Sequence, residues 1–168
     1  ADFPILAREV NGHPLVYLDS ANTSQKPRQV IEAMSEHLAA HNGNVARAIH
    51  TLGSEATEAY EGARTKVAEF IKAPAREEVV FTKNSTEALN LVAYSFSNAS
   101  LGSGARSTGR TSADPRFRLG PDDRVVISEM EHHSNLVPWQ LLCDRTGATL
   151  SWFGITDDGR LDLSNLDD

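Results

Sequence analysis

Two histidines and two carboxylates follow a short apolar run closely enough to act in one site. The run Val125–Ile127 predicts a buried strand, and soon after it come Glu129, Glu131, His132 and His133. Open α/β sheets bind their ligands at the carboxyl ends of strands. A histidine placed there can exchange protons near neutral pH or lie flat against an aromatic ring. The segment therefore indicates an enzyme that works with a cofactor.

A second candidate site lies where the predicted strand 78–82 leads into a helix. The hydroxyl groups of Ser85 and Thr86 fall in the first turn of that helix. Unpaired backbone N–H groups and the positive end of the helix dipole make such an N-terminus favourable for a phosphate. Ser85 is also suited simply to cap the helix, as any helix in water requires. The two roles are compatible, and both stay open.

A metal site and a purely structural loop are the alternatives for the segment around His132. The possible metal ligands are Glu129, Glu131, His132 and His133. Adjacent side chains on a loop diverge, however, and no spaced helical pair such as H-E-x-x-H occurs, so a metal is disfavoured. Either histidine alone is more typical of a loop held by hydrogen bonds. Only the accompanying phosphate site favours a catalytic role.

Strands and helices alternate along the chain and predict an α/β fold. Apolar residues at helical spacing indicate helices at 27–42, 54–73, 86–96 and about 135–146, and short apolar runs indicate strands at 15–18, 78–82, 124–128 and 148–155. The strand, helix and strand between residues 124 and 155 favour parallel pairing. Both candidate sites then lie at strand-to-helix connections.

Two stretches depart from this alternation. Residues 98–123 are rich in Ser, Gly, Arg, Asp and Pro, which predicts a mobile insertion, although its four arginines could instead form a docking patch for an acidic partner. Near the end, Ser164 and Asp167 are typical of a helix N-terminus, yet the sequence stops at Asp168. We therefore expect the 168 residues to be the N-terminal part of a longer protein, or one piece of a split chain.

Composition limits the partners and the compartment. The chain is 40% hydrophobic, and its net charge of −7 argues against nucleic acid or an anionic membrane as the main partner. No run approaches the roughly 18–20 apolar residues of a membrane span, and the first residues lack the pattern of a signal peptide. The one cysteine, Cys143, shares a helix stripe with Trp139 and Leu142, which favours a buried structural thiol over a nucleophile. We expect a cytoplasmic protein.

Four motifs, in order along the chain, resemble SufS-type (group II) cysteine desulfurases. They are Asp19-Ser20-Ala21 with Gln25-Lys26-Pro27, Arg47-Ala48-Ile49-His50-Thr51-Leu52, Asn84-Ser85-Thr86-Glu87-Ala88-Leu89-Asn90, and Glu131-His132-His133-Ser134-Asn135-Leu136-Val137-Pro138-Trp139-Gln140. Such enzymes are similar to class-V aminotransferases and depend on pyridoxal 5′-phosphate (PLP). The resemblance covers most of the chain outside residues 98–123.

The resemblance implies a fold-type I PLP-dependent transferase, of which this chain is the N-terminal part. Residues 1–50 would form an N-terminal segment near the active site and the dimer interface. Residues 51–168 would form the first part of the large PLP-binding domain with its mainly parallel sheet. The implied enzyme is a homodimer that converts L-cysteine to L-alanine and an enzyme persulfide. The sulfur would pass to an acceptor protein of the SufE or SufU type and to the Suf scaffold for iron–sulfur cluster assembly.

The resemblance also implies roles for single residues. His132 would stack on the pyridine ring of the cofactor and assist proton transfers, with His133 as a supporting neighbour. Thr86, together with the backbone around Ser85, would hold the cofactor phosphate. The periphery of the site would consist of Glu87 at the dimer contact, Arg47 and His50 across the dimer interface, and Ala21 and Asn22 near the substrate carboxylate.

Parts of the family pattern have no match in these residues. The lysines at 26, 66, 72 and 83 do not follow the family's Ser-x-His-Lys pattern, so the segment alone is expected to be inactive. Ala46 stands where many relatives carry histidine, and residues 22–24 also depart from the pattern. A selenocysteine lyase or a cysteine sulfinate desulfinase is the nearest rival, because one cofactor half-site serves all three enzymes. A catalytically silent fragment, or an assembly or binding module, is the rival from another class.

Overall fold

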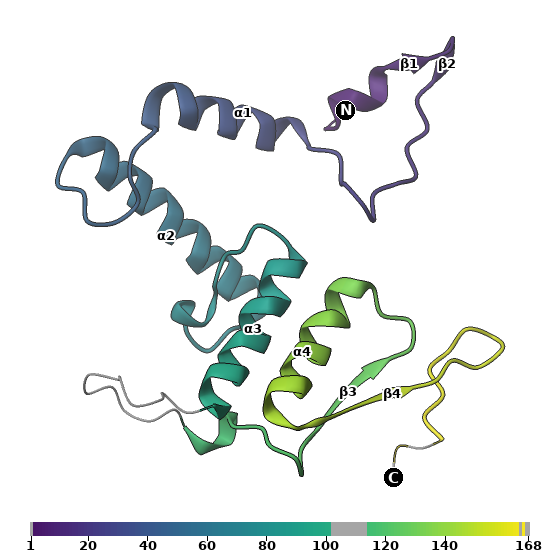
Figure 1. The fold of residues 1–168 in the computed structure, drawn as a ribbon. Coiled ribbons are helices and arrows are strands. Elements are labelled where there is room, and N and C mark those ends of the chain that lie inside the picture. The colour runs from purple at the N-terminus through teal and green to yellow at the C-terminus, as the bar shows by residue number, and fades with distance from the viewer. Residues whose placement is uncertain (1, 102–113, 165, 167–168) are drawn as a thin grey trace. The chain divides into compact units, whose positions relative to one another are not determined.

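The computed structural model describes residues 2–101, 114–164 and 166. The chain divides into two compact units, Ala1–Val80 and Phe81–Asp168 (Figure 1). The predicted division into residues 1–50 and 51–168 is of another kind, because it was based on the roles of these segments in an active site. It stays a prediction. Within the described ranges, no helix is long and apolar enough to cross a membrane.

The first unit begins with short elements. A 3-10 helix, η1 (Pro4–Ala7), precedes a hairpin in which β1 (Glu9–Val10) pairs antiparallel with β2 (His13–Pro14). Asn11 and Gly12 between the strands both have positive φ angles, 55° and 77°. This is the backbone of a type I′ turn, whose twist matches that of the strands it joins.

Two strands predicted from apolar runs, 15–18 and 78–82, do not form. A strand is completed by a ladder of hydrogen bonds to a neighbour, and among the described residues neither run belongs to a sheet. The N–H of Leu15 donates to the carbonyl of Arg8 at 3.0 Å, but this bond does not continue into a ladder. Val16, Leu18 and Val80 accordingly remain 75%, 91% and 62% exposed. The sequence pattern identified residues suited to a strand but could not supply the partner.

Helices make up the rest of the first unit: α1 (Arg28–Glu36), the π-helical turn η2 (His37–His41), α2 (Thr51–Ile71) and the 3-10 turn η3 (Arg76–Glu78). The helix predicted over 27–42 forms, but it starts at Arg28, with Pro27 as its N-cap rather than its first residue, and it becomes π-helical after Glu36. α2 begins ahead of the predicted Ser54, because His50 caps it. The ring Nδ1 of His50 accepts a hydrogen bond of 3.2 Å from the backbone N–H of Gly53.

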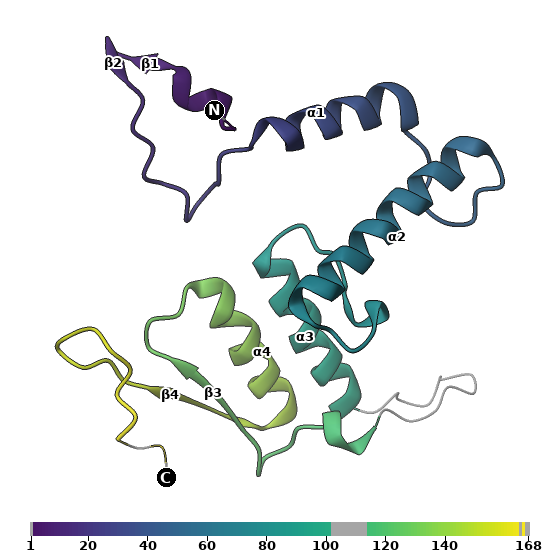
Figure 2. The ribbon, with the colours of Figure 1, turned by 180° about the vertical axis from the view of Figure 1, so that it is seen from behind.

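The second unit consists of helices packed on a parallel strand pair (Figure 1). Its elements are α3 (Ser85–Ser100), the 3-10 turn η4 (Pro115–Phe117), β3 (Arg124–Ser128), the 3-10 turn η5 (His133–Asn135), α4 (Val137–Thr146) and β4 (Thr149–Phe153). β3 and β4 pair in parallel, with Ile127 opposite Trp152, so the predicted strand, helix and strand are confirmed. α3 and α4 lie side by side with their N-termini at the same end (Figure 1; seen from behind in Figure 2).

Local signals set both ends of α4. Pro138 lies in the first turn, where the absence of its N–H costs nothing. Gly147 ends the helix with a φ of +80°, and its N–H donates to the carbonyl of Cys143 at 2.8 Å. The chain can then turn directly into β4, which keeps the crossover short.

The buried side chains of the second unit lie mainly on α3 and α4. Leu142 is only 2% exposed, whereas its neighbour Leu141 is 43% exposed. We expect Leu142→Ala to lower the free energy of unfolding by about 2–5 kcal/mol, because it leaves a cavity in a packed region. Chemical denaturation of the complete protein would measure this, with Leu141→Ala as the matched control. An equal loss in both variants would contradict the predicted core.

The predicted mobile insertion, residues 98–123, lies partly outside the described residues, which omit 102–113. At its edges, α3 continues to Ser100, and the hydroxyl oxygen of Ser100 accepts a hydrogen bond of 2.8 Å from the N–H of Leu119. The rings of Phe96 and Phe117 meet edge-on at 6.0 Å. The two flanks of this stretch are therefore joined to each other. The helix start predicted at Ser164 also involves residues outside the described ranges.

Candidate functional site

The cap of α3 is Asn84, not Ser85. The side-chain oxygen of Asn84 accepts a hydrogen bond of 2.9 Å from the N–H of Glu87. Asn84 is the last residue with extended backbone, so its side chain can reach back to the third helical N–H, whereas Ser85 is already helical. The capping role considered for Ser85 is therefore wrong, and its hydroxyl is available for another contact.

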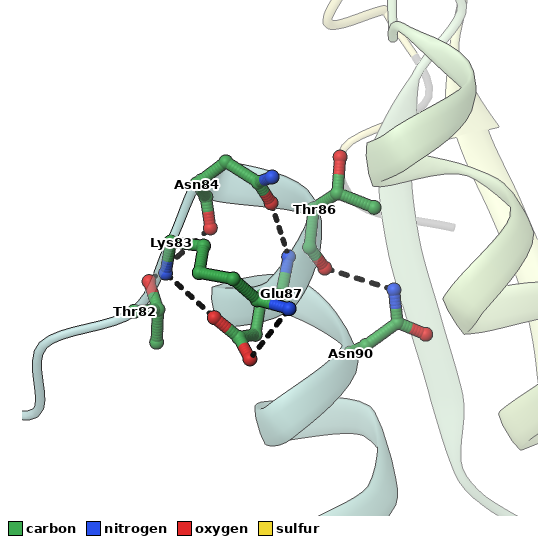
Figure 3. A network of polar contacts seen from close by, with 6 residues as sticks. All are labelled: Thr82, Lys83, Asn84, Thr86, Glu87 and Asn90. Carbon is green, nitrogen blue, oxygen red and sulfur yellow. Dashed lines mark hydrogen bonds and ion pairs between the residues drawn. The ribbon is translucent and has the colours of Figure 1, made fainter.

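Glu87 fastens the strand-to-helix connection (Figure 3). Its carboxylate accepts a hydrogen bond of 2.6 Å from the backbone N–H of Lys83, and it lies 3.8 Å from the Lys83 ammonium. The side-chain amide of Asn90 donates to the carbonyl of Thr86 at 2.8 Å. The ammonium beside Glu87 offsets a negative charge that would otherwise oppose an anion at this helix end. The predicted role of Glu87 at a dimer contact stays a prediction.

Ser85 and Thr86 leave several donors open at the start of α3. Within the described part of the chain, neither hydroxyl forms a hydrogen bond, and neither do the backbone N–H groups of these two residues. In Figure 3 the Thr86 hydroxyl takes part in none of the drawn contacts. Both residues are exposed. Two N–H groups and two hydroxyls at the positive end of a long helix match the needs of a phosphate group.

His132 caps η5 and has a defined tautomer. Its Nδ1 accepts a hydrogen bond of 3.2 Å from the N–H of Ser134 and lies 2.9 Å from the Ser134 hydroxyl. A backbone N–H can only donate, so in the neutral ring the proton resides on Nε2. The ring is exposed, and that of His133 meets it edge-on at 6.1 Å. Nε2 of the exposed His132 ring is therefore available to a ligand.

A chain of hydrogen bonds links residues that precede and follow the two histidines in the sequence. The Glu131 carboxylate accepts from the Ser128 hydroxyl at 2.6 Å and from the Asn135 amide at 2.7 Å. The amide oxygen of Asn135 accepts from the indole N–H of Trp139 at 2.8 Å. These two hydrogen bonds to the carboxylate lower the pKa of Glu131 below its usual range. We call these four residues the Glu131 network.

The Glu131 network was not predicted. Glu131, Asn135 and Trp139 are spaced four residues apart, a spacing that brings side chains together on a helix and was visible in the sequence. The contact with Ser128 depends on how the loop turns back toward β3. That loop geometry has no local sequence signature.

The second unit contains both predicted connections, and α3 packs against η5. Ser85, Thr86 and Glu87 open α3, and His132 precedes η5. The remaining predicted site residues belong to the first unit: Ala21, Asn22, Arg47 and His50. Their roles stay predictions.

The segment that carries Arg47 is held in an uncommon backbone conformation. Ala46 and Arg47 have φ angles of 61° and 56°, which residues with a Cβ rarely adopt. Thr57 stabilises it: its hydroxyl oxygen accepts from the N–H of Ala46 at 2.9 Å, while the hydroxyl donates to the carbonyl of Gly53 at 2.6 Å. Such strain often marks a functional segment. The sequence did not predict this role of Thr57, because its partner Ala46 lies 11 residues away in the chain.

A second tie from the same region joins η2 to α2. Nδ1 of His41 lies 2.7 Å from the Glu55 carboxylate, and this hydrogen bond raises the pKa of His41. Ala21 and Asn22 lie in an exposed turn, where the N–H of Asn22 donates to the carbonyl of Asp19 at 3.2 Å. All these contacts stay within the first unit.

Cys143 is buried, as predicted for a structural thiol. Burial raises the pKa of its thiol, with a smaller contribution from the charge of Asp144. The thiolate is therefore disfavoured, which makes Cys143 a poor nucleophile. Among the described residues, no group of three or more His, Cys, Asp or Glu side chains is placed to hold a metal ion.

Sequence comparison places these features in a family. The profile described as aminotransferase class-V matches residues 16–108 and 110–168. The chain belongs to the class-V aminotransferase family. The resemblance to cysteine desulfurases inferred from the four motifs is confirmed by relatives of this class-V chain. This class-V chain is 58% identical over 168 residues to a probable cysteine desulfurase of Streptomyces coelicolor. It is 47% identical over 167 residues to a cysteine desulfurase of Enterobacter sp..

Each of those two alignments includes 99% of this class-V chain but only 37% of the relative. Solved structures of cysteine desulfurases are also similar to this chain. A cysteine desulfurase from Thermococcus onnurineus is 41% identical with a TM-score of 0.69, and one from Escherichia coli is 34% identical with a TM-score of 0.64. Each match covers 90% of this chain and 33% of the other. The chain thus spans little more than a third of the length of its relatives.

Proposed function

We propose that the complete protein containing this chain is a PLP-dependent cysteine desulfurase, and that this chain supplies the side of the cofactor site that binds the phosphate and packs the ring. One observation carries the proposal: unpaired donors at the start of α3 belong to the same packed unit as His132. The family depends on PLP, and the relatives named cysteine desulfurases support L-cysteine as the proposed substrate.

The start of α3 would hold the cofactor phosphate. The N–H groups and hydroxyls of Ser85 and Thr86 would donate to its oxygens, aided by the positive end of the helix dipole. Asn84 already satisfies the N–H of Glu87, so binding would leave the cap intact. When bound, PLP supplies an electron sink for the amino-acid substrate.

His132 would pack its ring face against the cofactor ring and exchange a proton at Nε2. The opposite nitrogen, Nδ1, is occupied by the N–H of Ser134, which keeps the ring in one orientation and one tautomer. An imidazole can both give and take a proton during turnover.

The remaining machinery would come from outside this chain. It includes the lysine that joins the cofactor covalently, the group that pairs with the ring nitrogen, and the cysteine that carries the sulfur. We propose a homodimer in which Arg47 and His50 approach the site from the partner subunit, Glu87 borders the dimer contact, and Ala21 and Asn22 approach the substrate carboxylate. The persulfide sulfur would pass to an acceptor of the SufE or SufU type and to the Suf scaffold for iron–sulfur clusters.

Product analysis of the complete protein tests the proposal. With PLP, L-cysteine and a thiol reductant, we expect equal amounts of L-alanine and sulfide, and no alanine from the 168-residue chain alone. Selenocysteine and cysteine sulfinate serve as competing substrates. A strong preference for either would favour the related lyase or desulfinase. Absence of alanine from all three substrates would favour a catalytically silent assembly module.

A further inference from the structure

We infer that Glu131 is a positioning residue, which fixes the loop carrying His132 by tying it to the end of β3 and to the start of α4. The inference rests on the proposed function and names a residue that this function requires. Both oxygens of the Glu131 carboxylate already accept hydrogen bonds from neighbouring side chains. Its effect passes through His132.

The geometry of the Glu131 network supports this role. Both carboxylate oxygens are engaged, one by Ser128 at the end of β3 and the other by Asn135 in η5. Trp139, in the first turns of α4, holds the amide of Asn135 in the orientation that donates to Glu131. Three consecutive elements are thus joined through one carboxylate, and the loop cannot rotate without breaking a hydrogen bond.

The network brackets the histidine. Glu131 directly precedes His132, and Asn135 directly follows Ser134, whose N–H holds the His132 ring. The residue before the His132–Ser134 segment carries the carboxylate, and the residue after the segment donates a hydrogen bond to that carboxylate. Both ends of the segment are therefore held. A displacement of about 1 Å at a reacting group can reduce turnover a hundredfold, so such an anchor has a functional consequence.

The charge of Glu131 makes the anchor durable. Hydrogen bonds from Ser128 and Asn135 lower the pKa of the carboxyl group, so it stays ionised, and stays an acceptor for both donors, at neutral pH. The anchor is present above this lowered pKa and is lost only as the pH falls through it. Glutamine in its place has one acceptor oxygen and would turn an N–H₂ group toward a donor.

The test compares Glu131→Gln with Glu129→Gln in the complete protein. Glu129 lies on the same loop, and within the described residues its side chain forms no hydrogen bond. For Glu131→Gln we expect kcat for alanine formation to fall about 10- to 100-fold with a smaller change in KM, because His132 is displaced. Without cofactor, hydrogen–deuterium exchange should accelerate across residues 129–136. Glu129→Gln should match wild type in both measurements.

A double variant separates positioning from general destabilisation. In Glu131→Gln/Asn135→Asp the roles are reversed: the glutamine amide donates to the aspartate, which still accepts from Trp139. We expect this pair to recover at least about tenfold in kcat over Glu131→Gln and to restore slow exchange, whereas Asn135→Asp alone, with two facing carboxylates, should be impaired. Trp139→Phe, a milder change, should accelerate exchange in the same segment.

Some results would overturn the inference. They are wild-type exchange and kcat in Glu131→Gln, no recovery in the double variant, and unchanged exchange in Trp139→Phe. If wild-type protein forms no alanine, the proposed function fails instead. In that case the exchange data on cofactor-free protein still decide whether Glu131 holds this loop.

Discussion

Replacing His132 with alanine in the complete protein is expected to lower kcat for alanine formation from L-cysteine by about 10²- to 10⁴-fold, the range of positioned acid–base catalysis. The change removes both the imidazole ring and the Nε2 proton, while the N–H and the hydroxyl of Ser134 lose their contact with Nδ1. Steady-state assays of L-alanine, on protein saturated with PLP, would measure the effect.

The matched control is His133→Ala, which makes the same change one residue later. The His133 ring is exposed, and within the described residues its only ring contact is edge-on with His132. We expect a much smaller loss of kcat in this variant. Equal and small effects in the two variants would contradict the role assigned to His132, whereas equal and large effects would show that both rings are needed.

Removing the hydroxyls of Ser85 and Thr86 together, as Ser85→Ala/Thr86→Val, should weaken PLP binding about a hundredfold or more. Each hydrogen bond to a charged group contributes about 1.5–3 kcal/mol, and about 1.4 kcal/mol corresponds to a factor of ten in affinity. The backbone N–H groups remain, so binding should be weakened rather than abolished. Titration of the cofactor-free complete protein, followed by the absorbance of bound PLP, would give the affinity.

Two controls locate this effect at the phosphate. Pyridoxal lacks the phosphate, so its affinity should be the same for wild type and the double variant. Ser95→Ala removes a hydroxyl from the same helix, one that donates to the carbonyl of Leu91 at 2.7 Å, and should bind PLP like wild type. Loss of pyridoxal affinity in the double variant would mean that the helix start is distorted, and the phosphate assignment would then fail.

Local signals in the sequence were sufficient for α4 and its flanking strands. Pro138 and Gly147 mark where that helix can start and stop, because each acts through its own backbone. The same reasoning identified strand-to-helix connections at Ser85 and His132. It went wrong at residues 15–18 and 78–82, since an apolar run cannot reveal whether a partner strand lies beside it.

The cap of α3 shows a finer limit. Asn84 and Ser85 are adjacent and both are good capping residues, so composition does not choose between them. The choice depends on which of them still has extended backbone, and Asn84 does. Because Asn84 caps the helix, the Ser85 hydroxyl is not needed as a cap and is available for the proposed contact with a phosphate.

The sequence alone was enough to specify the family, the order of the helices and the two connections that carry Ser85, Thr86 and His132, because motifs and helix signals act over a few neighbouring residues. Only the tertiary structure decided how those side chains are held. The ties of Glu131 to Ser128 and of Ala46 to Thr57 depend on the paths of loops, and a hydrogen bond forms only where both partners arrive with the right distance and direction.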